Sequence, residues 1–346
     1  MKRFNMDFIR RRAEQSLMAK AVPANDAKLI VDSMLEADIC GVSTHGIKML
    51  VPYLQKIENQ SFNGWGGVKI TKQSPSFTVI DAENSIGAVA AGYAMDVCLE
   101  RAGEFGMHTA FVRHANTFGP AFYYVERVAK QGMIGFVCSN APAAMPAVNG
   151  LEVMLGTNPM AFACPSQTQG NIVLDMATSI VAKSRFEMAR IKGETLPEGW
   201  ALDKDGKPTT DPVEAIKGFV LPMAGFKGYG IAMAIDLLSG FLSGSSYLNK
   251  VNKFYASNDR GMDVGQMFMA INPQMVYEGD FLADMDEYIL RLRNSNVVDG
   301  KTIALPGDDR RANRQDALAH GITLAEETVK KLEALFGEPL REEVAL

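Results

Sequence analysis

Apolar residues recur at helical spacing in two stretches at the start of the chain. The first covers residues 5–20. The second begins at Asp26, a residue type that favours the N-cap position, and ends near Gly41. A buried strand is predicted at residues 77–82, and the apolar positions of residues 86–97 again have the spacing of a helix. The chain therefore opens with helices and only then enters a strand.

Further along, short apolar runs alternate with amphipathic segments. Strands are predicted at residues 109–115, 133–139, 160–165, 171–176, 217–223 and 265–272. Helices are predicted at 121–132 and 180–192, and a long apolar helix between the last two strands. A capping box from Thr323 to Glu326 predicts one more helix in the tail. This alternation favours an α/β protein, and its short connections suit antiparallel strand pairs.

The composition is that of an ordinary globular protein, with 47% apolar and 22% charged residues. Lys and Arg number 35 against 40 Asp and Glu, a formal charge of −5, and no dense basic stripe exists to bind nucleic acid. The longest apolar run, 230–242, is too short to span a membrane, and the start lacks the apolar stretch of a signal peptide. Cys40, Cys98, Cys138 and Cys164 are far apart, so we expect neither disulfides nor a metal site, and a cytoplasmic location.

One of the four histidines lies in a setting that suits catalysis. His45 follows the second predicted helix in the sequence Ser43-Thr44-His45-Gly46. An imidazole that titrates near neutral pH can exchange a proton with a carbonyl oxygen. The alternative is a histidine that caps a helix or completes the core, which is the commoner role. The pattern alone leaves both interpretations open.

Two loops and one glycine-rich turn are candidate ligand sites. The loops at 155–165 and 174–179 carry short polar side chains where buried strands end, although turns use the same residue types. The Rossmann fingerprint G-x-G-x-x-G is absent. Its nearest counterpart, residues 225–230, has the reversed glycine spacing at a predicted helix start, where Lys227 adds positive charge. This segment is either a phosphate contact or a tight turn between a strand and a helix.

Taken together, several segments resemble the type-2 malate/L-lactate dehydrogenase family. They are Thr44-His45-Gly46, LGTNPMAFACP (155–165), the long stretch 174–212, GFKGYGIAMAIDLLSGFLSG (225–244) and Pro306-Gly307-Asp308. The resemblance covers nearly the whole chain. It implies a non-Rossmann α/β fold, a homodimer, and NAD or NADP as cofactor, with NAD favoured and no metal.

The order of the predicted elements, together with the resemblance, suggests how the chain is divided. We expect residues 1–75 to form the helical N-terminal part of a substrate and dimer lobe. Residues 76–275 are expected to form a strand-rich, mixed-sheet core that binds the cofactor. Residues 276–346 are expected to be a helical C-terminal part that packs on the first lobe.

Particular positions match residues with known roles in the family. His45 matches the histidine beside the reacting carbon, which implies the acid in reduction and the base in oxidation. The residues expected to bind the cofactor are Asn140, Ala141, Thr157, Asn158, Asp175, Met176, Ala177, Thr178, Lys227, Gly228, Pro306, Gly307 and Asp308. Those expected to bind the substrate are Thr44, Lys48, Met49, Tyr53, Asn116 and Thr117.

Two positions depart from the family pattern. Many members carry an arginine four residues after the histidine, where this chain has Met49, and a second histidine where it has Thr117. A thioether cannot replace the bidentate grip of a guanidinium on a carboxylate. The expected reaction is hydride transfer between a nicotinamide cofactor and a small 2-hydroxy or 2-oxo acid. The alternatives are reduction of a cyclic imine carboxylate and a catalytically silent relative that only binds NAD(P).

Overall fold

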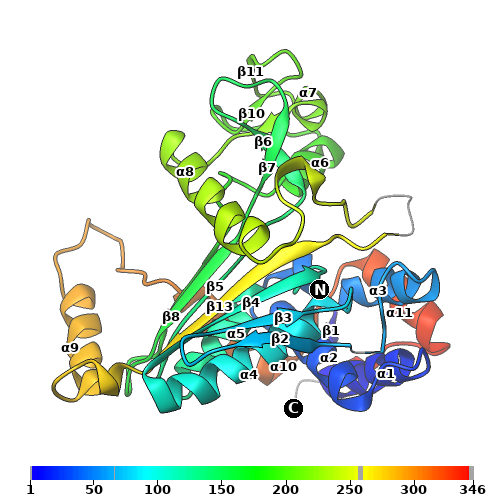
Figure 1. The fold of residues 1–346 in the computed structure, drawn as a ribbon. Helices are drawn as coiled ribbons and strands as arrows, with labels where there is room; N and C mark the ends of the chain where they lie inside the picture. The colour runs from blue at the N-terminus through cyan, green and yellow to red at the C-terminus, as the bar shows by residue number, and fades with distance from the viewer. Residues whose placement is uncertain (1, 66, 256–259, 343–346) are drawn as a thin grey trace.

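A seven-stranded mixed sheet forms the centre of the computed structural model, which describes residues 2–65, 67–255 and 260–342 (Figure 1). In sheet order, its strands are β2 (Lys69–Gln73), β3 (Phe77–Asp81), β4 (Met107–Ala115), β13 (Val264–Ile271), β5 (Ile134–Ser139), β8 (Met160–Cys164) and β9 (Ile172–Met176). β3 and β4 are parallel, and the other neighbouring pairs are antiparallel. The predicted α/β class with a mixed, non-Rossmann sheet is confirmed.

Two helices cover one face of this sheet. α4 (Gly87–Phe105) packs on β4 and β13, and α5 (Ala121–Ala129) packs on β5 and β8. α4 is rich in alanine, and a Cβ at its Gly92 would lie 2.3 Å from Leu29 of the next helix layer. The small side chains therefore allow the helical lobe to approach the sheet closely.

Both ends of the chain build a single helical lobe beside the sheet, as predicted (Figure 1). Its helices are α1 (Met6–Met18), α2 (Ala24–Ile39), α3 (Leu50–Glu58), α10 (Asp308–His320) and α11 (Glu326–Phe336). β1 (Arg3–Phe4) pairs with β14 (Ile322–Thr323), which joins the two ends directly. The short 3₁₀ turns η1 (Ser43–His45) and η2 (Ile47–Met49) connect α2 to α3.

Two predicted helix starts in the helical lobe are wrong, and the helix predicted from residue 180 begins only at Ser184. α2 begins at Ala24 rather than Asp26, because Pro23 ends the preceding turn and places Asp26 within the first helical turn, where a carboxylate favours the helix dipole. The capping box of the last helix does not form. Thr323 is paired with Arg3 in a strand, and α11 begins only after Ala325. In the second case, pairing between the chain ends overrides a local capping signal.

Within the predicted core segment, a separate lobe rises from the sheet (Figure 1). Its elements are β6 (Ala143–Pro146), β7 (Val153–Gly156), α6 (Ser184–Lys192), β10 (Ala201–Leu202), β11 (Pro208–Thr209), α7 (Pro212–Lys217), β12 (Phe219–Val220) and α8 (Phe226–Ile235). This outer lobe has a hydrophobic cluster of its own, which includes Leu155, Phe186 and Val220. Its last helix continues into a π-helical turn, η3 (Asp236–Phe241), which packs back on β13.

The remaining elements lie at the periphery. η4 (Leu248–Lys250) follows the π-helical turn, and η5 (Pro273–Met275) follows β13. α9 (Phe281–Arg293) stands out from the sheet and is held by Asp286, whose carboxylate accepts backbone N–H bonds from residues 167–169. Within the described residues, every helix is too short or too polar to span a membrane.

Candidate active site

A cavity of about 440 Å³ lies where the helical lobe, the strand ends and the outer lobe meet. Its walls come from η1, the loop between β4 and α5, the ends of β5 and β9, and α10. It brings together nine of the predicted site residues, namely Thr44, His45, Thr117, Asn140, Ala141, Thr157, Asp175, Met176 and Ala177. Segments more than 100 residues apart in the chain thus meet around one space.

The turn after α2 places His45 on the cavity wall. The helix ends at Ile39, Gly41 adopts a left-handed φ of 78°, and the His45 N–H donates to the Val42 carbonyl at 3.1 Å. His45 keeps exposed surface toward the cavity, while the protein packed around the ring partly desolvates it. Burial lowers its pKa below the ordinary 6.5, and the charge of Lys48 lowers it further. At neutral pH the imidazole is therefore mainly neutral and able to accept a proton.

Asp38 holds this turn from behind. Its Oδ2 accepts the Ile47 N–H at 2.6 Å, and a Cβ at Gly46 would lie 2.0 Å from its Oδ1. The space beside Gly46 is thus filled by the carboxylate. Burial raises the pKa of Asp38 to about 7, although the Ile47 N–H and Lys48 lower it. The position of His45 consequently depends on a carboxyl group that titrates near neutral pH.

Four of the predicted substrate residues lie outside the cavity. Tyr53 is buried behind it and donates from its hydroxyl to the Thr117 carbonyl at 3.4 Å. Met49 packs against the core, with its sulfur 3.9 Å from the Tyr255 hydroxyl, and Lys48 is exposed. The buried Asn116 amide binds the carbonyls of Asn84 and Ser85 and the Met262 N–H. Tyr53 and Asn116 thus support residues of the cavity wall, and none of the four lines the space.

Asp175 and Arg310 are the oppositely charged pair of the cavity. Asp175 Oδ2 accepts the Phe122 N–H at the start of α5, at 3.0 Å. Burial raises its pKa, while the Phe122 N–H and the positive charge of Arg310 lower it. The Arg310 guanidinium lies 5.2 Å from the Phe122 ring centroid and donates to the Val173 carbonyl. Arg310 thus faces the same space as His45 and Asp175.

Asparagine side chains fix the loops on the sheet side. Asn140 donates to the Ser246 carbonyl at 2.8 Å and accepts the Gly265 N–H at 2.9 Å. Asn158 accepts the Ala141 N–H and donates to the Ala232 carbonyl on α8. The Thr178 hydroxyl donates to the carbonyls of the 157–158 loop. Asn158 and Thr178 are fully buried, so their side chains position the loop backbone that borders the cavity.

The remaining predicted cofactor residues do not line this cavity. Lys227 is exposed in the first turn of α8, and a Cβ at Gly228 would lie 2.2 Å from the Met223 carbonyl, so the turn requires glycine. Pro306 accepts the Val173 N–H at 2.9 Å, which joins the Pro306–Asp308 loop to β9. The Asp308 carboxylate is bound to the Leu305 N–H and to Arg293 and Arg311.

Sequence reasoning missed several cavity residues. Arg310 is four positions after Pro306, in the first turn of α10. Its closeness to the Pro306–Asp308 motif is the only sequence signal for its place in the site. Met262 and Val264 also line the cavity, but they precede a buried strand and look like ordinary core positions. Asp38 gave no signal because its contact is made across a turn. Each of these residues acquires its position through tertiary packing.

The space fits an elongated ligand. A second cavity of about 410 Å³ adjoins the first, and Arg310 lines both. Gly307 and Gly119 on their walls have left-handed φ angles of 103° and 83°, so the backbone is bare there. The shared wall, the buried carboxylate of Asp175 and the bare backbone are features that suit a dinucleotide.

Comparison with known proteins identifies the family. The family model described as malate/L-lactate dehydrogenase matches residues 4–333. The L-sulfolactate dehydrogenase of Methanocaldococcus jannaschii is 37% identical over 294 residues, which cover 85% of each chain. The ureidoglycolate dehydrogenase (NAD(+)) of Escherichia coli K12 is 29% identical over 324 residues, covering 92% of this chain and 91% of that one.

The fold agrees with a solved structure of the same family. The sulfolactate dehydrogenase of M. jannaschii superposes with a TM-score of 0.91 at 33% identity, covering 97% of this chain and 98% of that chain. The resemblance inferred from the sequence motifs is confirmed. The chain belongs to the malate/L-lactate dehydrogenase family and is an oxidoreductase of 2-hydroxy acids that uses NAD or NADP.

Proposed function

We propose that His45 exchanges the proton of this reaction with the substrate oxygen. When bound, the nicotinamide of NAD(P) supplies or accepts the hydride. In oxidation, the neutral His45 imidazole takes the proton of the substrate hydroxyl, and in reduction the imidazolium returns it to the carbonyl oxygen. The observation that supports this role is the place of His45 on the wall of a cavity that it shares with Asp175 and Arg310, with a pKa lowered below 6.5.

The cofactor is proposed to lie along β9 and the loops that border it. Asp175, Met176 and Ala177 line the cavity at the end of this strand, and the 306–308 loop joins its other end. Lys227 extends from the outer lobe and is proposed to reach a phosphate. Asp175→Ala and Lys227→Ala should each weaken NADH binding in a fluorescence titration. An unchanged dissociation constant in either variant would remove that residue from the proposal.

We propose NAD rather than NADP as the preferred cofactor. A 2′-phosphate needs an unengaged cation, and the arginines of the adjoining cavity already have partners. Arg311 is paired with Asp308 and Arg314 is paired with Glu36, while Arg310 faces the active-site cavity, where it is proposed to bind the substrate carboxylate. Steady-state assays with both reduced cofactors test this preference, and a higher kcat/KM with NADPH would contradict it.

The substrate is proposed to be a small monocarboxylate with an uncharged tail. Among the described wall residues, Arg310 is the one permanently charged cation, and Asp175 would repel a second carboxylate. Most other walls are apolar, as in Val42, Phe118 and Met262. Oxaloacetate should therefore trail the best 2-oxo monocarboxylate by at least about tenfold in kcat/KM.

A substrate panel separates this function from its alternatives. Oxidation of NADH by a 2-oxo acid supports the proposed reaction, whereas turnover with pyrroline- or piperideine-2-carboxylate alone would support a cyclic imine reductase. Binding of NADH without oxidation by any substrate would indicate a silent relative. A preference for oxaloacetate over every monocarboxylate would show that the pocket binds a second carboxylate.

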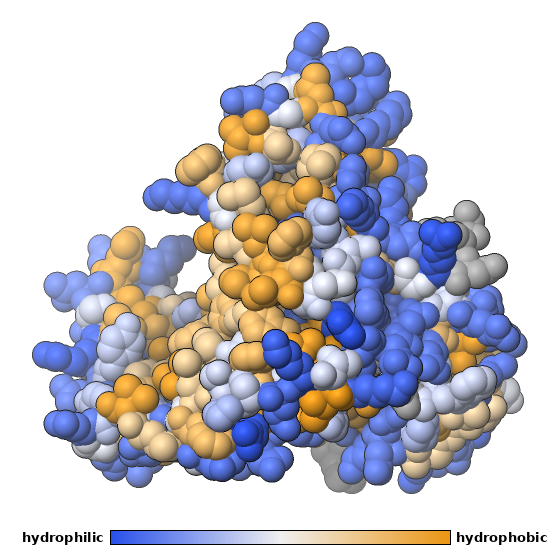
Figure 2. Space-filling model, viewed as in Figure 1, coloured by the Kyte–Doolittle hydropathy of each residue, from blue (hydrophilic) through white to orange (hydrophobic). Residues whose placement is uncertain are grey.

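We also propose a homodimer, which the family resemblance implies. An apolar face runs along α8 and η3 in the middle of the molecule (Figure 2). Phe226, Phe241 and Leu242 are 74%, 59% and 59% exposed there. Monomers rarely leave such a patch in water, and a second copy is the partner proposed to cover it. Light scattering should give twice the chain mass, and Phe241→Glu should shift it toward the monomer.

A cytoplasmic location completes the proposal. All four cysteines lie in described residues, are buried and remain unpaired thiols. Burial raises the pKa of Cys40, Cys98 and Cys138 to about 12 in each case, so these thiols stay protonated and inert. Such chemistry suits a reducing compartment. Cell fractionation tests it, and recovery outside the cytoplasmic fraction would contradict it.

A further inference from the structure

A separate cavity of about 530 Å³ lies behind the active site, and its walls are polar or glycine throughout. Its lining residues are Asn84, His114, Ser246, Lys250, Asn252, Arg260, Gly261 and Asp263. Successive residues of the segment 261–264 divide the two spaces. Met262 and Val264 face the active-site cavity, whereas Gly261 and Asp263 face this second one. The two cavities therefore lie back to back across a single strand of backbone.

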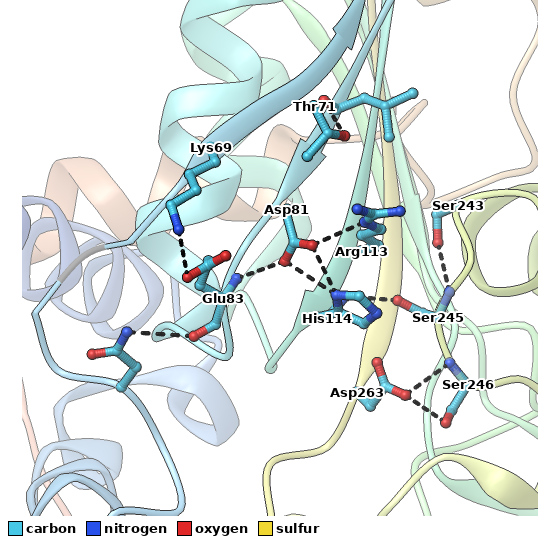
Figure 3. Close-up of polar contacts among 12 residues, drawn as sticks. Lys69, Thr71, Asp81, Glu83, Arg113, His114, Ser243, Ser245, Ser246 and Asp263 are labelled. Atoms are coloured by element: carbon cyan, nitrogen blue, oxygen red, sulfur yellow. Dashed lines mark hydrogen bonds and ion pairs between the residues drawn. The ribbon is translucent and has the colours of Figure 1, made fainter.

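His114 is held firmly on the wall of this rear cavity. Its Nδ1 lies 3.1 and 3.0 Å from the two oxygens of Asp81, which also accepts the Arg113 Nε–H at 3.0 Å (Figure 3). Its backbone N–H donates to the Ser245 hydroxyl at 2.8 Å, and its φ is +53°. A carboxylate at Nδ1 places the ring proton there, so Nε2 is the nitrogen available to a ligand.

Asp263 presents an unsatisfied acceptor to the same region. Its Oδ2 accepts the Ser246 N–H at 3.2 Å and the Ser246 O–H at 2.7 Å (Figure 3). Its Oδ1 is buried without a hydrogen-bond partner among the described residues. A buried carboxylate oxygen left without a donor is costly, so a hydroxyl or ammonium group brought by a ligand would stabilise it.

The opposite charge lies across the rear cavity. Lys250 and Arg260 are exposed on its wall, and the ion pairs of the described residues include neither of them. Lys250 Nζ donates to the Tyr247 hydroxyl at 3.0 Å and lies 4.4 Å from the centroid of that ring, which fixes the ammonium in place. The two cations outnumber the single carboxylate, so the wall as a whole attracts an anion.

We propose that this rear cavity is a binding site for a small hydroxylated carboxylate, separate from the active site. Lys250 and Arg260 bind the carboxylate of the ligand, and its hydroxyl donates to Asp263 Oδ1. His114 Nε2 accepts a second hydroxyl or, when protonated, donates to the carboxylate. Because the 261–264 segment forms a wall of both cavities, a ligand bound in one cavity alters the position of the wall of the other.

Histidine NMR tests this proposal directly, because His45 and His114 each report on their own cavity. The probes for the ¹³C-histidine-labelled protein are L-malate, succinate, which lacks the hydroxyl, and inorganic phosphate. His114→Asn assigns the reporter signal. Malate should shift the His114 signal in a saturable way, and succinate should require about tenfold higher concentration because Asp263 gains no donor.

Matched variants identify the contacts. Lys250→Ala/Arg260→Ala should raise the malate concentration needed at His114 by at least about tenfold. Lys204→Ala/Lys207→Ala, which removes two exposed cations of the outer lobe, should leave it unchanged. Asp263→Asn should abolish the preference for malate over succinate.

Three outcomes would overturn the proposal. One is a His114 signal that malate does not shift, whether or not the His45 signal moves. Another is an equal response to malate, succinate and phosphate, which would indicate simple screening of charge. The third is unchanged malate binding in Lys250→Ala/Arg260→Ala.

Discussion

The two cavities on either side of the 261–264 segment use histidine in opposite ways. His45 lies in a cavity whose described walls are mostly apolar, the described residues pair it with no carboxylate, and desolvation lowers its pKa. His114 lies among polar walls and is bound by Asp81 and surrounded by further charges. Proton exchange with a substrate needs an imidazole that is neutral near the working pH, whereas a binding site needs one fixed in orientation. The environment, rather than the residue type, decides the role.

The largest expected effect on activity is at His45, which is proposed to transfer the proton. His45→Asn should lower kcat by about 10²–10⁴-fold, because the positioned acid–base group is lost. The NADH dissociation constant should change little. Steady-state kinetics and a fluorescence titration measure the two quantities, with His320→Asn as the control at an exposed position. Near-normal turnover would return His45 to a structural role and remove the contrast between the cavities.

The next effect should come from Asp38, which positions His45 without touching the cavity. Asp38→Ala should lower kcat by about tenfold to a hundredfold, because the Ile47 N–H loses its acceptor and the His45 turn shifts. Asp38→Asn keeps an acceptor and should be milder.

The pH profile distinguishes positioning from mere support of the fold. The pKa of Asp38 is raised to about 7, so the unaltered enzyme should lose oxidation activity as pH falls through 7, when the carboxylate is protonated. A second loss should follow below 6.5 as His45 gains a proton. The Asp38→Asn variant should show only the second loss of activity, the one caused by protonation of His45. If both ionisations persist in that variant, another group titrates near pH 7.

Much of this fold could be predicted from local pattern. The strands at β4, β5, β8 and β9 follow runs of buried residues, and helix ends such as the one before Gly193 follow residue preference. Where predictions failed, distant residues decided the outcome. Thr323 pairs with Arg3 across the whole chain, which no local capping signal can reveal.

The candidate site shows the same difference between residues with a local sequence signal and residues placed by distant contacts. The family motifs identified His45 and Asp175, both of which line the cavity. Arg310 and the whole rear cavity were missed, because they arise where segments far apart in the sequence pack together. His114 lies at the end of a predicted strand, and its contact with Asp81 on the neighbouring strand has no local sequence signal.

A smaller effect is expected at Arg310, the lone permanent cation among the described walls of the active-site cavity. Arg310→Ala should raise the KM for a 2-oxo acid by about tenfold, since the substrate carboxylate loses a charged donor. kcat should fall less. Arg310→Lys should recover part of the loss, because it keeps the charge without the planar fork. An unchanged KM with weaker NADH binding would instead assign Arg310 to the cofactor.

The smallest expected effect is on stability, at Asp81, whose carboxylate holds His114. Burial alone would raise the pKa of Asp81, but the Glu83 N–H, His114 and Arg113 lower it below the ordinary 3.8. A carboxylate whose pKa is lower in the folded than in the unfolded protein stabilises the fold at pH values above its unfolded-state pKa. This stabilisation is lost as the pH falls through the folded-state pKa. Asp81→Asn should therefore cost about 1 kcal/mol of unfolding free energy at pH 6, since His114 and Arg113 are partly exposed. The difference between the two proteins should shrink below pH 3.8 in urea unfolding. A difference in unfolding free energy that stays constant down to pH 3 would show that Asp81 holds His114 through shape and neutral hydrogen bonds. The charge of Asp81 would then not distinguish the environments of the two histidines.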